Sequence, residues 1–413
     1  MTEGALEGIR VVEFCDELGA YCGKLLADLG AEVIKVEPPG GGIQRMSPPF
    51  YLGHETVDAS VAFWTHNTSK KSVVLDLETE EGRAQARRLA LTADIVIEDH
   101  PMGYLAARGL GYAALAAERP ALVYTSITGF GQTGPRAGWA YTDIVGQAMG
   151  GLMTLAGEMA DPPSVIYGSQ ANVSASIHAA QGTMAALLHA EATGRGQQVD
   201  VSAQEAVSMS QETAMETWDF QKRNRVRTGA LGLLPVQLPG AGVYPTPDGW
   251  ISMLVIAPGG AGFPGLVQWM RDEGMAEDLD DEPYASLCQN LNMATITRVT
   301  GDPEAAREIV PQLVHINDII RRFVASMPKR QVYEEGQARR LLIGIVSDPR
   351  DLAENTQLRA REWYHSLAFP ALGAEVEFMG PPYRLSGSPT VISRPPNLGE
   401  HTAEVLAALE AGR

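Results

Sequence analysis

Residues 8–42 read GIRVVEFCDELGAYCGKLLADLGAEVIKVEPPGGG, and this stretch decides the fold. Gly8–Phe14 is a short apolar run of strand length, and residues 24–29 have the composition of a helix core. Gly30 stands where a helix C-cap is expected, and Ala31–Glu37 has the pattern of a second strand. The stretch therefore predicts one strand–helix–strand unit, closed by a turn of proline and glycine.

The same alternation continues along the chain. Thr79 is placed to cap a helix over residues 80–91, and a long helix rich in small residues is expected over 171–192. Further strands are expected at 72–77, 94–98, 121–127 and 198–202, with a polar helix from 204 to about 223. Strands that alternate with helices predict an α/β fold, with a mostly parallel, Rossmann-like sheet covered on both faces.

The length of 413 residues favours two domains. Around residues 233–248 the composition shifts to glycine, proline and apolar residues, and a run of glycines follows at 259–262. We expect a large α/β domain that begins at 1–224, a smaller inserted α+β domain at 225–330, and a return to the large domain over 331–413.

The net charge of the chain disfavours some classes of partner. With 32 basic and 50 acidic residues the net charge is −18, which disfavours nucleic acid and anionic membranes as partners. Residues 1–7 lack the basic and apolar segments of a signal peptide, and no apolar run has the roughly 20 residues of a membrane helix. Three cysteines without CxxC spacing imply neither disulfides nor a metal site, so we expect a cytoplasmic protein.

The first strand–helix turn, Cys15–Gly23, lacks the GxGxxG spacing of dinucleotide-binding folds and carries two acids. A nicotinamide cofactor is therefore disfavoured. Cations gather instead before the strand at residue 72, where Asn67–Ser72 joins two lysines to short polar side chains that suit a phosphate. The same segment, taken alone, also fits a solvated loop that enters a strand.

Segments spread over the whole chain carry a resemblance to a known family. They are LEGIRVVE at 6–13, LLADLGAEVIKVEPPGGG at 25–42, NTSKKSVVLDL at 67–77, ADIVIED at 93–99, GLGY at 109–112, YTSITGFGQTGP at 124–135, TGRGQQVDVS at 193–202 and LGEHTAEVL at 398–406. In this order and spacing the sequence resembles the class III (CaiB/BaiF) CoA-transferases.

The resemblance implies an interlocked-ring dimer that transfers CoA between carboxylic acids, with CoA and acyl-CoA as substrates and no tightly bound cofactor. In such enzymes an aspartate attacks the acyl thioester, forms a mixed anhydride and then a thioester to CoA, and passes CoA to the acceptor acid. The glycine run at 259–262 resembles a mobile loop of the family. The matching CoA-contact candidates are Lys35, Arg45, Asn67, Lys70, Lys71, Ser72, Arg108 and Arg136.

Two departures concern the chemistry. The family's nucleophilic aspartate lies at the head of the helix before TGRGQ, where this chain has Asn172. An amide cannot form the anhydride, because its nitrogen is a poor nucleophile and its oxygen carries no charge. The racemase branch of the family pairs that aspartate with a histidine, and the matching residue here is Thr142. A basic residue that is common in the family just before GLGY also appears one place late, as Arg108 after Ala107.

We therefore expect one subunit of a hetero-oligomeric transferase, whose homologous partner carries the aspartate. Residues 16–24 resemble the nucleophile-lacking subunit of the two-subunit transferases that activate (R)-benzylsuccinate in aromatic compound degradation. Three alternatives remain. In the first, the chain is a self-sufficient transferase that uses another carboxylate such as Asp161. In the second, it is an acyl-CoA racemase, isomerase or lyase. In the third, it is a CoA-binding scaffold without activity.

Overall fold

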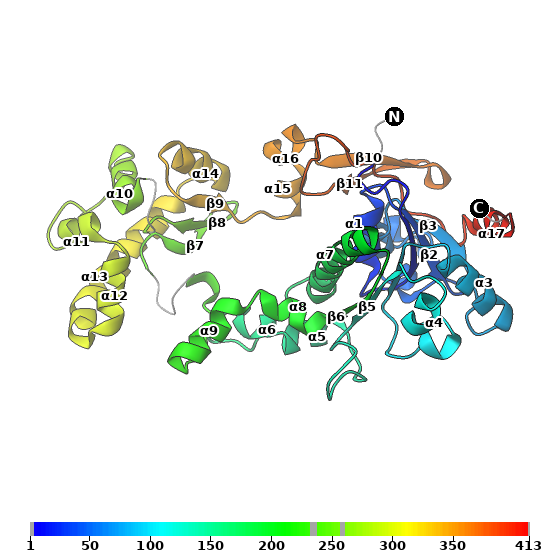
Figure 1. The fold of residues 1–413 in the computed structure, drawn as a ribbon. Coiled ribbons are helices and arrows are strands. Elements are labelled where there is room, and N and C mark those ends of the chain that lie inside the picture. The colour runs from blue at the N-terminus through cyan, green and yellow to red at the C-terminus, as the bar shows by residue number, and fades with distance from the viewer. Residues whose placement is uncertain (1–3, 232–237, 257–260, 412–413) are drawn as a thin grey trace. The chain divides into compact units, whose positions relative to one another are not determined.

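The computed structural model describes residues 4–231, 238–256 and 261–411 (Figure 1). Residues 259 and 260 of the glycine run, and 233–237 of the stretch with shifted composition, lie outside the described residues. The chain divides into a large unit and a small unit, and the domain limits expected at 224 and 330 stay predictions. The large unit holds Met1–Met153, Val165–Lys222 and Thr356–Arg413, and the small unit holds Thr154–Ser164 and Arg223–Asn355.

The centre of the large unit is a six-stranded sheet in the order β3-β2-β1-β4-β5-β6, with every neighbouring pair parallel. This is the strand order of doubly wound nucleotide-binding folds, and it confirms the predicted parallel α/β sheet. The strands are β1 (Arg10–Phe14), β2 (Glu32–Glu37), β3 (Lys71–Val74), β4 (Ile95–Glu98), β5 (Val123–Thr128) and β6 (Gln198–Ser202).

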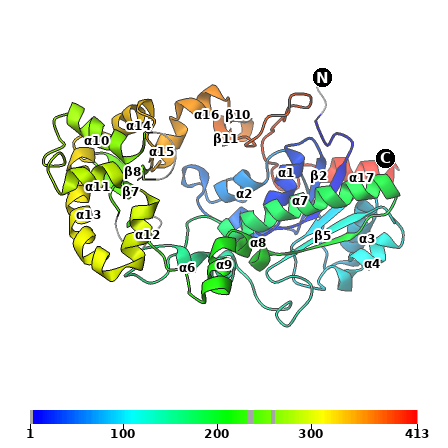
Figure 2. The same ribbon diagram turned by 60° about the vertical axis from the view of Figure 1, so that its left-hand side comes forward.

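Helices cover both faces of this sheet because successive strand residues point to opposite sides. Val11 and Ile95 pack with α1 and α7, which runs along one face (Figure 2), whereas Val12 and Val96 pack with α3, α4 and α17 on the other. The helices of this unit are α1 (Ala20–Ala27), α2 (Val61–His66), α3 (Glu80–Ala90), α4 (Tyr112–Ala116), α5 (Asp143–Met149), α7 (Gln170–Thr193), α8 (Ala203–Met209), α9 (Glu212–Gln221), α16 (Thr356–Ala360) and α17 (Thr402–Glu410).

A second, smaller layer of the large unit is an antiparallel hairpin of β10 (Tyr364–Phe369) and β11 (Ala374–Met379). Phe369 and Phe378 of this hairpin form an apolar cluster with Phe63 and Trp64 of α2. The hairpin therefore joins the C-terminal part of the chain to its first seventy residues.

The small unit has its own apolar core, in which Trp269 and Phe323 meet edge to face. Its sheet is antiparallel, with β7 (Ala241–Thr246), β8 (Gly249–Leu254) and β9 (Ile343–Ile345). The helices around it are α10 (Gly262–Asp272), α11 (Tyr284–Asn290), α12 (Met293–Gly301), α13 (Pro303–Val324), α14 (Lys329–Ala338) and α15 (Pro349–Ala353), and α6 (Leu152–Leu155) spans the boundary between the units.

Two local predictions are wrong. The first helix ends at Ala27 with Asp28 as its cap, so Gly30 is not the cap, although its φ of 104° is the left-handed conformation that glycine permits. The helix expected from residue 204 to about 223 is two helices, α8 and α9, separated by Ser210 and Gln211.

The predicted cap of α3 is confirmed, because the Thr79 side chain accepts a hydrogen bond from the Gly82 amide. None of the described helices combines the length and the apolar character that a membrane crossing requires.

Candidate active site

The carboxyl ends of β1, β4 and β5 form the rim of a cavity beside the parallel sheet. In doubly wound folds ligands bind at this edge, where the strand order reverses, and here the reversal lies between β1 and β4. The cavity has a volume of about 630 Å³, and the loop 137–142 and Asn172 also line it. A neighbouring cavity of about 190 Å³ opens at the ends of β1, β2 and β3 and shares Asp16 and His100 with the first.

Asn172 lies in the first turn of α7 with only 4% of its surface exposed. The Tyr141 hydroxyl donates a hydrogen bond of 3.1 Å to Asn172 Oδ1. Burial, with the charge of Asp143, raises the pKa of Tyr141 far above its ordinary value, so the hydroxyl stays a donor. The contact occupies the amide oxygen, and no described residue accepts a hydrogen bond from Nδ2 of this side chain.

Asp143 fixes the start of α7. Its Oδ1 accepts hydrogen bonds from the backbone amides of Ala171 at 2.8 Å and Asn172 at 3.0 Å, and its Oδ2 accepts one from Gln147 Nε2 at 2.7 Å. A carboxylate at a helix N-terminus is stabilised by the helix dipole and by the unpaired amides there. Asp143 therefore positions Asn172, and its oxygens are already used.

Two more carboxylates shape the cavity. Asp99, directly after β4, accepts hydrogen bonds from the amides of Asp16, Leu18 and Gly19 at 2.9–3.1 Å. Asp16 in turn accepts from the amides of Ile43 at 2.6 Å and Gln44 at 3.0 Å. Burial raises the pKa of Asp99 to about 7, although the hydrogen bond from Gly19 acts in the opposite direction. This chain of contacts fixes both loops that border the cavity.

Lys35 and Lys70, two predicted CoA contacts, are buried and share the buried carboxylate of Glu13. Lys35 Nζ lies 3.1 Å from Glu13 Oε1 and also bonds the Cys15 carbonyl, and Lys70 Nζ lies 2.8 Å from Glu13 Oε2. Burial lowers the pKa of Lys70, and Glu13 only partly offsets this effect. Lys70 also donates to Asn67 Oδ1 at 2.9 Å, so three of the predicted contacts belong to one internal network.

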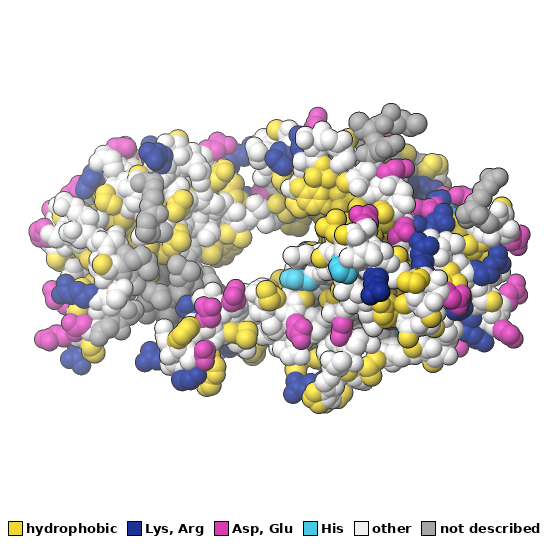
Figure 3. Space-filling view, in the orientation of Figure 1, with side chains coloured by type: hydrophobic (Ala, Val, Ile, Leu, Met, Phe, Trp, Pro, Cys, Tyr) yellow, Lys and Arg dark blue, Asp and Glu magenta, His cyan; other side chains and the backbone are white. Residues whose placement is uncertain are grey.

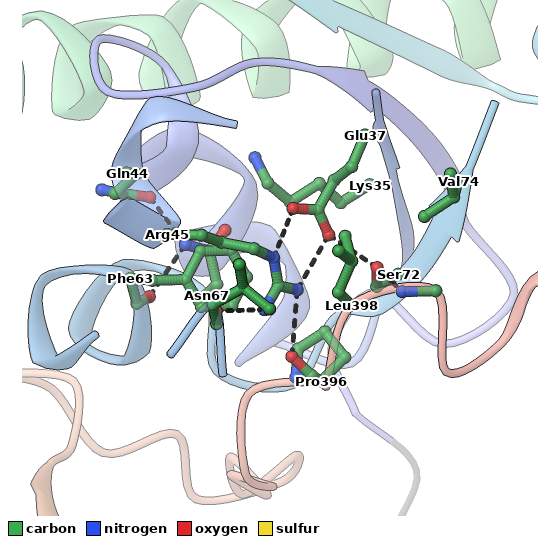
Figure 4. Close-up of polar contacts among 12 residues, drawn as sticks. Lys35, Glu37, Gln44, Arg45, Phe63, Asn67, Ser72, Val74, Pro396 and Leu398 are labelled. Atoms are coloured by element: carbon green, nitrogen blue, oxygen red, sulfur yellow. Dashed lines mark hydrogen bonds and ion pairs between the residues drawn. The ribbon is translucent and has the colours of Figure 1, made fainter. Parts of the chain in front are cut away.

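Arg45 and Ser72, also predicted contacts, meet on Glu37 (Figure 4). The Arg45 guanidinium forms two bonds to Glu37, of 2.6 and 2.9 Å, and a third of 3.1 Å to the Pro396 carbonyl. Ser72 Oγ donates to Glu37 Oε1 at 2.6 Å, and the Arg45 guanidinium lies 3.7 Å from the centre of the Phe63 ring. Burial raises the pKa of Glu37, but the bonds from Arg45 and Ser72 and the charges of Lys35 and Arg45 together outweigh burial and hold the pKa below the ordinary value.

The remaining predicted cations lie nearer the surface. Lys71 pairs with Glu32 at 3.0 Å and with Glu404 at 2.8 Å, and Arg108 pairs with Glu78 at 2.7 Å. Arg136 lies 5.1 Å from the centre of the Trp139 ring. The role of all these residues in CoA binding stays a prediction, and the structure brings none of them except Lys35 to the lining of the two cavities.

Asp161, the predicted substitute nucleophile, belongs to the small unit and is exposed. Its backbone carbonyl accepts hydrogen bonds from Arg227, and it does not line the cavity of Asn172. Sequence reasoning missed Asp16, Glu17 and Asp99 as cavity residues. The available signal was the position of each acid within three residues after a predicted strand. Across the described ranges, no three His, Cys, Asp or Glu side chains converge as metal ligands do.

Comparisons with known proteins agree on one family. The family model described as CoA-transferase family III matches residues 6–402. The succinyl-CoA:(R)-benzylsuccinate CoA-transferase subunit BbsE of Thauera aromatica is 34% identical over 401 residues, which cover 96% of this chain and 92% of that protein. The succinate–glutarate CoA-transferase of Agrobacterium fabrum is 33% identical over 411 residues, with 98% and 96% covered. A crystal structure of a CAIB/BAIF family protein from Brucella suis superposes with a TM-score of 0.82 at 28% identity, and covers 98% of this chain and 100% of that one.

Proposed function

This chain belongs to CoA-transferase family III and is a transferase chain that acts on CoA thioesters, and from that premise we propose that it is the subunit without the nucleophile in a hetero-oligomeric enzyme. A partner chain of the same fold supplies the aspartate. The enzyme exchanges CoA between succinyl-CoA and a carboxylic acid.

The observation that carries the proposal is the state of Asn172. The first turn of α7 keeps the buried position, the tyrosine contact and the carboxylate of Asp143 that together would orient an attacking group. The group itself is an amide, which has neither the charge nor the lone-pair reactivity to attack a thioester carbonyl. A site with intact support and an unreactive centre fits a subunit whose partner performs the chemistry.

An exposed apolar surface on α9 supports the presence of a partner chain. No described residue of this helix is buried, yet Met215 is 61% and Trp218 is 52% exposed, and the two lie three residues apart on one face of the helix. Hydrophobic side chains reach the surface in this part of the molecule in the space-filling view (Figure 3). Clustered apolar side chains of this size on a surface are typical of protein–protein interfaces.

The substrates follow from the names of the relatives. The names of both relatives contain succinyl-CoA or succinate. One of these two, BbsE, is a subunit of an enzyme for (R)-benzylsuccinate. We assign succinyl-CoA as the donor and an aromatic dicarboxylic acid of the benzylsuccinate type as the acceptor. The cavity volume of about 630 Å³ lies in the range of pockets that hold ligands of this size.

The test is an assay of CoA exchange between succinyl-CoA and a panel of carboxylic acids. We expect the purified chain to be inactive alone and active when it is co-expressed with a homologous chain that has the aspartate. We also expect Asn172→Asp to give the isolated chain measurable turnover, whereas the matched Asn172→Ala stays inactive. Full activity of the unmodified chain alone would overturn the proposal.

A self-sufficient transferase is the second candidate, because the cavity of Asn172 does contain carboxylates. Glu17 is exposed and receives only a 3.3 Å hydrogen bond from Ser47, so its oxygens are accessible. Asp161 remains the other acid to examine. Hydroxylamine treatment during turnover, followed by mass spectrometry, would label whichever carboxyl group becomes activated, and no label on this chain would exclude this candidate.

A further inference from the structure

The crevice at the carboxyl edge of the parallel sheet is acidic. Among the described residues that line its two cavities, the carboxyl groups are Asp16, Glu17, Glu37, Asp76, Glu78 and Asp99, against a single lysine, Lys35, and no arginine. His100 also lines both cavities, and burial lowers its pKa to about 4, so it is neutral at pH 7. The lining groups therefore carry far more negative than positive charge.

Four cations near this crevice already have carboxylate partners, whereas Arg136, exposed beside the lining residue Ala137, lies 5.1 Å from the centre of the Trp139 ring and has no carboxylate partner among the described residues. Arg45 neutralises Glu37, and Arg108 neutralises Glu78. The buried Lys35 and Lys70 share one carboxylate, Glu13, and leave at most one positive charge in surplus.

Within the described ranges, no lysine or arginine pairs with the remaining carboxyl groups, which are Asp16, Glu17, Asp76 and Asp99. Even if Asp99 is counted as neutral, Asp16, Glu17 and Asp76 outnumber the surplus lysine charge and the charge of Arg136, so the crevice stays negative.

The polar groups left free in the larger cavity suit an uncharged ligand. Asn172 offers its Nδ2 donor, because its oxygen is already bound to Tyr141. Glu17 offers accessible acceptor oxygens. A pantetheine arm carries two amides and a hydroxyl group, which donate to carboxylates, and carbonyl oxygens that accept from an amide. The phosphates of CoA would meet carboxylates in this crevice, and like charges repel.

We propose that the crevice of this subunit binds the uncharged acyl-pantetheine arm through Asn172 and Glu17 and repels the phosphates of CoA. The inference rests on the proposed function, since it describes the ligand of the same site. On this proposal the partner chain binds the phosphates of CoA and so holds the CoA molecule in the enzyme. Asn172 then acts as a hydrogen-bond donor to a carbonyl oxygen of the ligand, and no covalent step takes place on it.

The test compares two probes by calorimetric titration of the purified full-length chain without a partner. The probes are S-acetyl-pantetheine and acetyl-CoA, which differ only in the nucleotide and its phosphates. We expect acetyl-pantetheine to bind at least as tightly as acetyl-CoA. The affinity for acetyl-CoA should rise as ionic strength increases from about 0.02 M to about 0.3 M, because salt screens repulsion.

Variants separate the two contacts. We expect Glu17→Gln to raise the affinity for acetyl-CoA about threefold to tenfold, and Asn172→Ala to lower the affinity for acetyl-pantetheine about tenfold. Glu205→Gln, the same substitution at an exposed position of α8 outside the cavity, should change neither affinity.

Two results would overturn the inference. One is tighter binding of acetyl-CoA than of acetyl-pantetheine by about tenfold or more, with an affinity that falls as salt rises. The other is no binding of either probe. Both measurements are independent of turnover and of the partner chain, so their failure is distinct from a failure of the exchange assay. The thermal unfolding midpoint of each variant shows whether it is folded.

Discussion

Two polar regions of the large unit differ in how completely their groups are paired. Around Glu37 the polar groups are paired. Arg45 and Ser72 both donate hydrogen bonds to the Glu37 carboxylate, and Arg45 also donates one to the Pro396 carbonyl. This cluster joins β2 and β3 to the C-terminal segment. At the head of α7, the backbone is equally well fixed by Asp143, but no described residue accepts a hydrogen bond from the Asn172 Nδ2 donor, which lies beside a cavity.

The difference separates structural from functional parts of the family resemblance. The cationic residues in the matching motifs are the ones that sequence reasoning assigns to CoA, yet the structure gives most of them carboxylate partners within the chain. A buried charge needs such partners, since removal from water is costly without them. A cation in a matching motif can therefore be required by the fold alone.

The largest expected effect comes from breaking the cluster around Glu37. Arg45→Met removes a buried guanidinium and leaves the buried carboxylate of Glu37 without its main partner. We expect a loss of roughly 3–5 kcal/mol in the free energy of unfolding, which is typical when one member of a buried pair is removed. Unfolding by denaturant, followed by circular dichroism, measures it.

The matched control is Arg195→Met, at an exposed arginine in the turn after α7. It should change the free energy of unfolding by no more than about 0.5 kcal/mol. If Arg45→Met instead unfolds like the natural chain but loses affinity for acetyl-CoA, the guanidinium serves the ligand and our structural interpretation is wrong.

The second effect tests the fixed backbone at the head of α7. Asp143→Ala leaves the amides of Ala171 and Asn172 and the side chain of Gln147 without their acceptor. We expect a loss of about 1–3 kcal/mol in the free energy of unfolding, and faster hydrogen exchange confined to the first turn of α7. The measurements are denaturant unfolding and hydrogen exchange read by mass spectrometry.

Asp143→Asn serves as the control because it keeps one acceptor oxygen, and it should lose less stability than the alanine variant. Unchanged exchange in the first turn of α7 after Asp143→Ala would show that the helix starts there without the carboxylate. The support of Asn172 would then have to come from Tyr141 alone.

The sequence predicted the sheet well because strand and helix signals are local. The alternation of short apolar runs and helical segments led to the parallel sheet, and the six strands appear within a few residues of the expected ranges. The position of Asn172 at the head of a helix was expected from the family resemblance, and it lies in the first turn of α7. The break between α8 and α9 was missed, since Ser210 and Gln211 are not strong helix breakers.

The partners of the charged side chains could not be predicted, because they depend on contacts between distant parts of the chain. Arg45 bonds the carbonyl of Pro396, which lies 351 residues away in sequence. Asp16 and Asp99 meet only because β1 and β4 are neighbours in the sheet. A local motif contains the residue types of such a cluster but not its connectivity, so the same lysines and arginines fit a ligand site and an internal network equally well.

The smallest expected effect compares one histidine from each region through pH. His66 accepts a hydrogen bond from Gln44 near the Arg45 cluster, and His100 lines the cavities. For each, burial is the largest cause that lowers the pKa to about 4, from an ordinary value near 6.5. The unfolded chain then binds more protons between these values, so the contribution of each histidine to stability is complete above pH 6.5 and is lost as pH falls toward 4.

We expect His66→Gln and His100→Gln each to reduce the fall in the free energy of unfolding between pH 7 and pH 5 by about 1–2 kcal/mol. Denaturant unfolding at both pH values, with His189→Gln on the exposed side of α7 as the control, measures the difference. A ligand such as acetyl-pantetheine should shift the His100 contribution and leave that of His66 unchanged, because only His100 borders the cavity.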